Sequence, residues 1–187
     1  INTDDSLDRA YLIVRVTDAQ ASAALLDALA DVSGRATFLF SEKQLPESGD
    51  LLRRLLISGS AAALDIDASG GASRTLGAIE RGNRALWAAC NAKTRLVYLS
   101  GASEATVRAV QEAGYCPITL DLDYSGELPS SSRAASRILS LARRGGCAVC
   151  LGADSAAQDI WNTLLARLRA SSCPISQLSE LSAQREA

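Results

Sequence analysis

The stretch YLIVRVTDAQASAALLDALA at residues 11–30 decides the fold class, because a strand and a helix follow each other within it. Residues 11–16 form a short β-branched, mainly apolar run, which is typical of a strand buried on both faces. In residues 21–30 the leucines recur at helical spacing. A buried strand followed by an amphipathic helix is the repeating unit of a parallel α/β sheet.

The same alternation continues along the rest of the chain. We expect further strands at residues 36–40, 61–66, 95–99, 116–122, 147–151 and 173–175. We expect helices at residues 49–57, 73–92, 103–114, 133–144 and 156–170, and one or two closing helical turns at 176–182. Strands alternating with helices indicate parallel βα units rather than a sandwich. A seven-unit αβ barrel and a doubly wound sheet both fit this pattern.

Length and composition describe one domain without a general affinity for polyanions. The chain has 187 residues, 48% of them hydrophobic, enough for a single core over residues 1–187. We interpret residues 1–10 as an N-terminal arm or linker from a longer precursor. The net charge of −2 argues against nucleic acid as a partner. No stretch approaches the roughly 20 apolar residues that span a bilayer.

The chain contains no histidine, which excludes more chemistry than any motif suggests. Without imidazole there is no histidine acid or base, no Ser-His or Cys-His nucleophile, and no metal site that depends on histidine. There are two Trp, four Tyr and two Phe, so a glycan site would offer few stacking platforms and would have to be polar.

Five cysteines are too few, and odd in number, for a disulfide scaffold. Cys147 and Cys150 form a CxxC string, but an offset of three on a strand points them to opposite faces, so we interpret the motif as accidental. If helix ends and the following strand starts share one rim, Cys90 lies near Cys116 and Cys147 near Cys173. Two disulfides there, with Cys150 a buried thiol, are a hypothesis that requires an oxidising compartment.

Six further segments, in order, carry a family pattern. They are RATFLFSEKQL (35–45), LLRRLLISGSAAALD (51–65), RLVYLSGASEATVRAVQEAGY (95–115), CPITLDLD (116–123), RRGGCAVCLGAD (143–154) and SCPISQLSEL (172–181). They resemble the polysaccharide deacetylase (NodB homology) family, whose corresponding motifs include KATFFVxGxxL, RxPYG and KxGxIVLLHD. The resemblance extends over residues 11–181.

This resemblance implies a distorted seven-stranded (β/α) barrel with its pocket at the carboxyl ends of the strands. Active relatives remove acetyl groups from cell-wall or chitin-like glycans with zinc or another divalent metal, held by an Asp and two His. A neighbouring Asp acts as base and a distant His as acid. The metal lowers the pKa of its water and polarises the acetyl carbonyl.

Most of the matching positions are changed in this chain. By resemblance the catalytic base falls on Thr17 and the metal-binding Asp on Asp18, while the two ligand histidines fall on Asp65 and Ser69. The catalytic acid falls on Gly152. Thr17 cannot act as a base near neutral pH, and glycine supplies no acid.

The RxPYG motif is matched by Arg95 and Tyr98, and the carboxylate that pairs with its arginine by Asp121 or Asp123. An Arg95 pair with one of these aspartates would remain as a fold-holding contact, since the base is missing, with a substrate clamp as the alternative. Tyr98 is interpreted as core or pocket wall.

The retained acids also have simpler interpretations. Asp18 follows a strand, where Asp commonly caps the next helix. Asp65 and Asp67 at a strand end are most simply solvated loop acids. The alternative is a substituted site in which Asp18, Asp65 and Asp67 bind Mg²⁺, Ca²⁺ or Mn²⁺.

The sequence therefore favours a catalytically degenerate deacetylase-like domain without a cofactor. We expect a binding or structural module of the bacterial cell envelope, outside the cytoplasm, with a glycan or another envelope protein as partner. The alternative is an active metal-dependent hydrolase that uses Asp18, Asp65, Asp67 or Asp121. A third interpretation is a protein-interaction module that uses a helical face.

Overall fold

One curled sheet of parallel strands forms the centre of the protein. The computed structural model describes residues 9–126, 129–144, 146–154 and 157–179. Within them, eight strands run in the order β5-β4-β3-β2-β1-β7-β6, with β8 added beside β1, and every pairing is parallel. The strands are β1 (Ala10–Val16), β2 (Thr37–Phe40), β3 (Ala61–Asp67), β4 (Leu96–Ser100), β5 (Cys116–Pro117), β6 (Leu122–Tyr124), β7 (Cys147–Ala153) and β8 (Ile175–Ser176).

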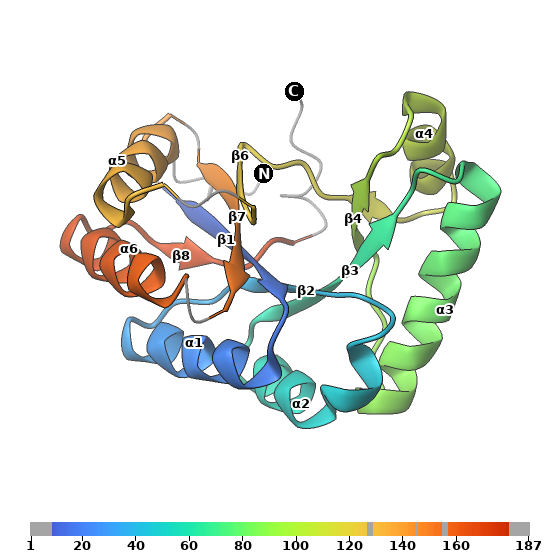
Figure 1. Ribbon diagram of the computed structural model, residues 1–187, viewed down its shortest axis with the longest axis horizontal. Coiled ribbons are helices and arrows are strands. Elements are labelled where there is room, and N and C mark those ends of the chain that lie inside the picture. Colours follow the sequence, from blue (N-terminus) through green and yellow to red (C-terminus); the bar gives the residue numbers. More distant parts are fainter. Residues whose placement is uncertain (1–8, 127–128, 145, 155–156, 180–187) are drawn as a thin grey trace, which may run out of the picture.

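The helices lie around the outside of this sheet (Figure 1). They are α1 (Ala19–Asp31), α2 (Gly49–Ile57), α3 (Ala72–Cys90), α4 (Glu104–Glu112), α5 (Ser131–Ala142) and α6 (Gln158–Ala170), with a short 3₁₀ turn η1 (Leu45–Glu47). Their buried apolar side chains belong to one core cluster on the outer face of the sheet, and the inner cluster contains no helical residue. This arrangement confirms the distorted (β/α) barrel and excludes a doubly wound sheet, which would be covered by helices on both faces.

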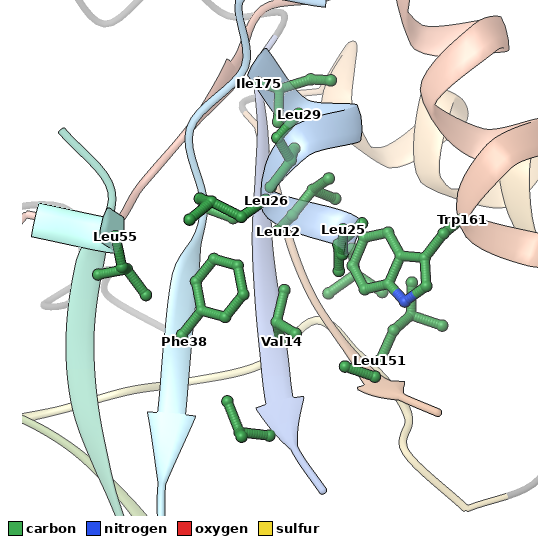
Figure 2. Close-up of a cluster of buried hydrophobic side chains, with 14 of the residues drawn as sticks. Leu12, Val14, Leu25, Leu26, Leu29, Phe38, Leu55, Leu151, Trp161 and Ile175 are labelled. Carbon is green, nitrogen blue, oxygen red and sulfur yellow. The ribbon is translucent and has the colours of Figure 1, made fainter. Parts of the chain in front are cut away.

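Alternate residues of each strand face the two clusters. Leu12, Val14 and Phe38 pack outward against α1, α6 and their neighbours, as Figure 2 shows. Ile13 and Leu39, one position along, face the inside of the barrel. Because successive side chains point to opposite faces, one apolar run fills both the outer layer and the barrel interior.

The strand expected at residues 116–122 is divided in two. Pro117 ends β5, and the chain then leaves the edge formed by β4 and joins the opposite edge formed by β7. The Ile118 N–H donates to the Val97 carbonyl and the Asp121 N–H donates to the Ala148 carbonyl, both at 2.8 Å. Residues 118–121 therefore carry the chain between the two edges of the open sheet.

The closing helical turns expected at residues 176–182 are wrong over the part that the structure describes. Ser176 lies in β8, and residues 177–179 have no helical structure. The Leu178 N–H donates to Thr37 Oγ1 at 2.9 Å, which holds this segment against the inner cluster. Residues 180–182 lie outside the described residues, as do residues 1–8 of the expected arm, whereas Ala10 already belongs to β1.

Candidate functional site at the barrel mouth

Polar side chains collect on the inner face of the barrel towards the carboxyl ends of the strands. The register places Asp65 on β3 opposite Tyr98 on β4, and Asp123 on β6 opposite Cys150 on β7. Arg15 lies near the end of β1, between these pairs. We call the following set the mouth cluster: Arg15, Asp65, Tyr98, Asp123, Ser125 and Cys150.

Arg15 connects the members of the mouth cluster. Its Nε lies 3.1 Å from Asp65 Oδ2 in an ion pair, although the N–H is not aligned as a hydrogen-bond donor. Its Nη1 donates to Ser125 Oγ at 2.8 Å, and Ser125 Oγ donates in turn to Asp123 Oδ1 at 2.6 Å. The guanidinium carbon lies 5.3 Å from the centre of the Tyr98 ring, within the range of a cation–π contact.

The charges of the mouth cluster explain the pKa shifts of its members. Burial raises the pKa of Asp65, and the charge of Arg15 opposes this rise. Burial alone would lower the pKa of Arg15, but the surrounding acidic groups, Asp65 foremost, raise it overall. Burial also raises the pKa of Cys150 to about 12. At neutral pH the cluster therefore contains one guanidinium and a thiol that is not a nucleophile.

Asp18 is the N-cap of α1. Its Oδ1 accepts hydrogen bonds from the Gln20 N–H at 2.8 Å and from the Ala21 N–H at 3.4 Å. Thr17 is exposed, and its Oγ1 donates to the Ala153 carbonyl at 3.1 Å. The capping interpretation thus accounts for Asp18, whose carboxylate is committed to the helix N-terminus.

Asp67 and Ser69 form a turn at the end of β3. Asp67 Oδ1 accepts from the Ser69 N–H at 3.0 Å, and both residues are exposed. Hydrogen bonds from Ser69 lower the pKa of Asp67. Asp65, by contrast, is half-buried and paired, so the interpretation as a solvated loop acid is wrong for it and holds for Asp67.

The substituted metal site is not assembled in the described part of the chain. Among the described residues, no three His, Cys, Asp or Glu side chains come together to hold an ion, and this includes Asp18, Asp65 and Asp67. The donor set therefore does not fit the zinc that the resemblance implies, which needs at least three protein ligands.

Arg95 lies at the amino end of β4, far from the mouth cluster. The expectation that it pairs with Asp121 or Asp123 is wrong. Arg95 precedes β4, and its Nε donates to the Gly114 carbonyl at 2.6 Å. Asp121 Oδ2 accepts from the Ala148 N–H at 2.7 Å. No ion pair between described residues joins Arg95 to Asp121 or Asp123. Because Arg95 is three residues before Tyr98, its Cα lies roughly 10 Å nearer the amino end of the strand. An odd offset also points the two side chains to opposite faces of the sheet.

Gly152 lies inside β7, beside Arg15 in the register of β1. Its carbonyl accepts a hydrogen bond from Trp161 Nε1 at 2.9 Å. An added Cβ would meet only Asp154 Oδ2, at 3.6 Å, so the position has room for a side chain but carries none.

The five cysteines are all thiols in the structure, and neither expected disulfide is formed among the described residues. Cys90 Sγ donates to the Leu86 carbonyl of its own helix, which accounts for its orientation. Cys147 belongs to the outer core cluster and Cys150 to the inner one. The CxxC string therefore has its two sulfurs on opposite faces of β7, as the spacing predicted.

Arg15, Ser125 and Cys150 belong to the mouth cluster but escaped sequence reasoning. One signal for Arg15 was available, because it is the single charge in an otherwise apolar strand. A charge in such a strand needs a polar partner on one face. Ser125 carries no comparable signal, since its role depends on the reach of Arg15.

The protein shares its fold, but no detectable sequence family, with known proteins. No family model and no curated protein matches the sequence. Several solved structures share the fold. A polysaccharide deacetylase from Bacillus cereus has a TM-score of 0.79 at 16% identity, covering 94% of each chain. The wild-type form of a carbohydrate esterase family 4 pseudoenzyme from Bacillus anthracis has a TM-score of 0.78 at 16% identity, covering 96% of this chain and 67% of the other.

A third structure, a family 4 carbohydrate esterase from Streptomyces lividans in complex with acetate, has a TM-score of 0.78 at 18% identity, covering 96% of this chain and 97% of the other. The chain therefore has the NodB-type fold of the carbohydrate esterase family 4 polysaccharide deacetylases. Both active enzymes and pseudoenzymes have this fold. None of the described helices has the length and apolar character needed to cross a membrane.

Proposed function

We propose that this protein is a catalytically degenerate deacetylase-like domain that acts as a non-enzymatic binding or structural module of the bacterial cell envelope. One observation carries the proposal: the Arg15 guanidinium lies 3.1 Å from Asp65 in the mouth of the barrel. Asp65 is the residue that matches a metal ligand by resemblance.

Metal-assisted hydrolysis needs a cation with an open coordination position, a base and an acid. Here a protein cation already neutralises Asp65, and it is held in place by Ser125 as well. The position matching the base is Thr17, whose hydroxyl donates to a carbonyl, and the position matching the acid is Gly152. The residues present thus support retention of the barrel without its chemistry.

A binding role is supported by what remains at the mouth. Arg15, Asp123 and Ser125 offer donors and acceptors, and Tyr98 offers a ring, which together suit the hydroxyl groups and apolar faces of a sugar. One similar structure is described as a peptidoglycan deacetylase from Bacillus subtilis. By this analogy the ligand is a cell-wall glycan, and the domain acts outside the cytoplasm as part of a longer envelope protein.

The experiment separates binding from hydrolysis. Purified protein is incubated with acetylated chito-oligosaccharides or with peptidoglycan, with Zn²⁺, Mg²⁺ or Mn²⁺ added in parallel, and released acetate is measured. We expect no release above the protein-free control and retention of the protein on the insoluble glycan. Arg15→Met should weaken retention, whereas Arg54→Met, which removes a surface arginine paired with Asp27, should not.

Acetate release that Asp18→Ala abolishes would overturn the proposal in favour of an active hydrolase. Absence of retention on either glycan would overturn the glycan-binding role and favour a protein partner at a helical face.

A further inference from the structure

A groove lies at the opposite end of the barrel from the mouth cluster. Its volume is about 600 Å³, and it opens beside α3, at the amino ends of β4 and β5. We call it the basic groove. Its principal lining residues are Asn83, Arg84, Lys93, Thr94, Arg95 and Tyr115.

The floor of the basic groove is held by a pair of hydrogen bonds. Asn83 Nδ2 donates to the Thr94 carbonyl at 3.0 Å, and the Thr94 N–H donates to Asn83 Oδ1 at 2.8 Å. The Asn83 side chain is buried, so this contact fixes the loop after α3 against the helix. The loop turns back because Asn91 adopts a left-handed conformation, with φ 56°. The groove is thus a formed feature rather than a gap between mobile segments.

Cations outnumber acids in the basic groove. Arg84, Lys93 and Arg95 line it together with one carboxylate, that of Glu80. Arg84 and Lys93 make no ion pair with any residue that the structure describes, and both are exposed. The whole chain carries a net charge of −2, so this local excess of positive charge opposes the overall balance. A groove lined by charges of one sign raises the local concentration of ligands that carry the opposite charge.

Two aromatic rings lie beside the cations of the basic groove. The Tyr115 ring lines the groove, and the Lys93 ammonium lies 5.8 Å from the centre of the Trp87 ring. Trp87 is 51% exposed, which is unusual for the largest apolar side chain. An exposed Trp ring and a partly buried Tyr ring beside charged donors suit a ligand that has both apolar faces and anionic groups.

We propose that the basic groove binds an oligosaccharide that carries carboxylate groups. Arg84 and Lys93 pair with the carboxylates, while Tyr115 and Trp87 contact the faces of the sugar rings. Among the described residues, those that line the groove include no aliphatic side chain, so the groove lacks the desolvated pocket in which protein partners usually bury an anchoring side chain. The proposal rests on the groove alone and is independent of the function proposed for the barrel mouth.

The protein contains its own reporter for this test. It has two tryptophans, Trp87 exposed at 51% and Trp161 buried at 3%, so a ligand in the basic groove should alter the emission and the acrylamide quenching of Trp87 alone. The probe is an oligomer of galacturonic acid, titrated into the full chain at low salt. Its methyl ester, which keeps the same sugar backbone and chain length but carries no charge, is the matched ligand control.

Charge-reversal variants locate the site. Arg84→Glu with Lys93→Glu should weaken binding of the galacturonic acid oligomer roughly tenfold or more, since two attractive charge pairs with the ligand are replaced by like-charge repulsion. Lys43→Glu with Arg108→Glu makes the same change in net charge at exposed positions elsewhere and should leave binding unchanged. Arg84→Gln with Lys93→Gln is the milder variant, and circular dichroism confirms that each variant is folded.

Several outcomes would overturn the proposal. They are absence of binding, equal binding of the methyl ester, or equal loss in the control variant. Equal binding of polyglutamate would assign the groove to acidic peptides, and equal binding of tripolyphosphate would reduce it to a general anion site. Arg15→Met should leave binding at the groove intact, which separates this result from the test of the barrel mouth.

Discussion

Arg15 and Asp65 form an ion pair across an intervening strand: Arg15 lies on β1, Asp65 on β3, and β2 runs between them. The contact is possible because the sheet curls and both side chains rise from its inner face. Their side chains are 27% and 21% exposed, so the pair is largely but not completely removed from water. A pair in such a position contributes little net stability, whereas breaking it leaves a costly charge behind.

Replacing Arg15 with methionine should therefore destabilise the protein. We expect the free energy of unfolding at neutral pH to fall by about 1–3 kcal/mol, less than for a fully buried pair because water reaches both side chains. The double variant Arg15→Met with Asp65→Asn should recover part of this loss, since no charge then lacks its partner. Urea unfolding measures both effects. A single variant as stable as the wild type would show that the ion pair is not formed.

The stability of the protein should also depend on the protonation of Asp65. The folded-state pKa of Asp65 is raised above the ordinary value of an aspartate, 3.8, chiefly by burial. The stability that this shift contributes is fully present below pH 3.8 and is lost as the pH rises through the folded-state pKa. Urea unfolding at a series of pH values measures it, with Asp65→Asn as the variant that lacks this dependence.

The same aspartate provides a direct spectroscopic test. The charge of Arg15 opposes the rise of the Asp65 pKa, so Arg15→Met should move that pKa further upward. A carbon-13 titration of the Asp65 carboxyl group measures this. A downward movement, or none, would contradict the assigned contact.

The cysteines should differ in reactivity, with Cys150 the least reactive. Burial raises the pKa of Cys150 to about 12, so almost no thiolate exists at neutral pH, and the side chain has no exposed surface. Cys90 is only partly buried and should react with a thiol reagent first. After denaturation without reductant, five thiols should be titrated. One thiol would instead support the two disulfides.

Two glycines should respond to alanine in opposite ways. At Gly152 a Cβ meets its nearest neighbour at 3.6 Å, so alanine fits, and the free energy of unfolding should be unchanged or rise by up to about 1 kcal/mol. At Gly82 a Cβ would lie 3.0 Å from Leu64 Cδ1, in the outer core. There alanine should destabilise the protein, because the clash outweighs the gain in helix propensity of about 1 kcal/mol. Thermal unfolding compares the two variants.

The sequence predicted the elements well where the periodicity was local. The helix at residues 49–57 has the predicted bounds, and the long helix beginning after Gly71 differs by a residue or two at its ends. The division between β5 and β6 was not predicted, because CPITLDL alternates apolar and polar residues after Pro117 and so resembles a single strand. Nothing in such a run shows that its two ends pair with opposite edges of the sheet.

The candidate site was predicted only in part. Asp65, Tyr98 and Asp123 were placed near the pocket by motif resemblance, and the structure brings them to the barrel mouth. The cation that connects them was assigned to Arg95 instead of Arg15. Motif spacing fixes where a residue stands on a strand, but it does not describe how far a long side chain reaches across a curved sheet.

The crossing at residues 118–121 has a mechanical consequence. The two edges of the sheet are joined there by four residues of chain and by three hydrogen bonds, one to Val97 on β4 and two between Asp121 and Ala148 on β7, rather than by a strand ladder. In the described part of the chain, β5 and β6 are the two edge strands, and no strand pairing closes the barrel between them. Because residues 118–121 bond to Val97 and Ala148, near the amino ends of β4 and β7, any widening of the barrel between these two strands would have to break hydrogen bonds of this short segment.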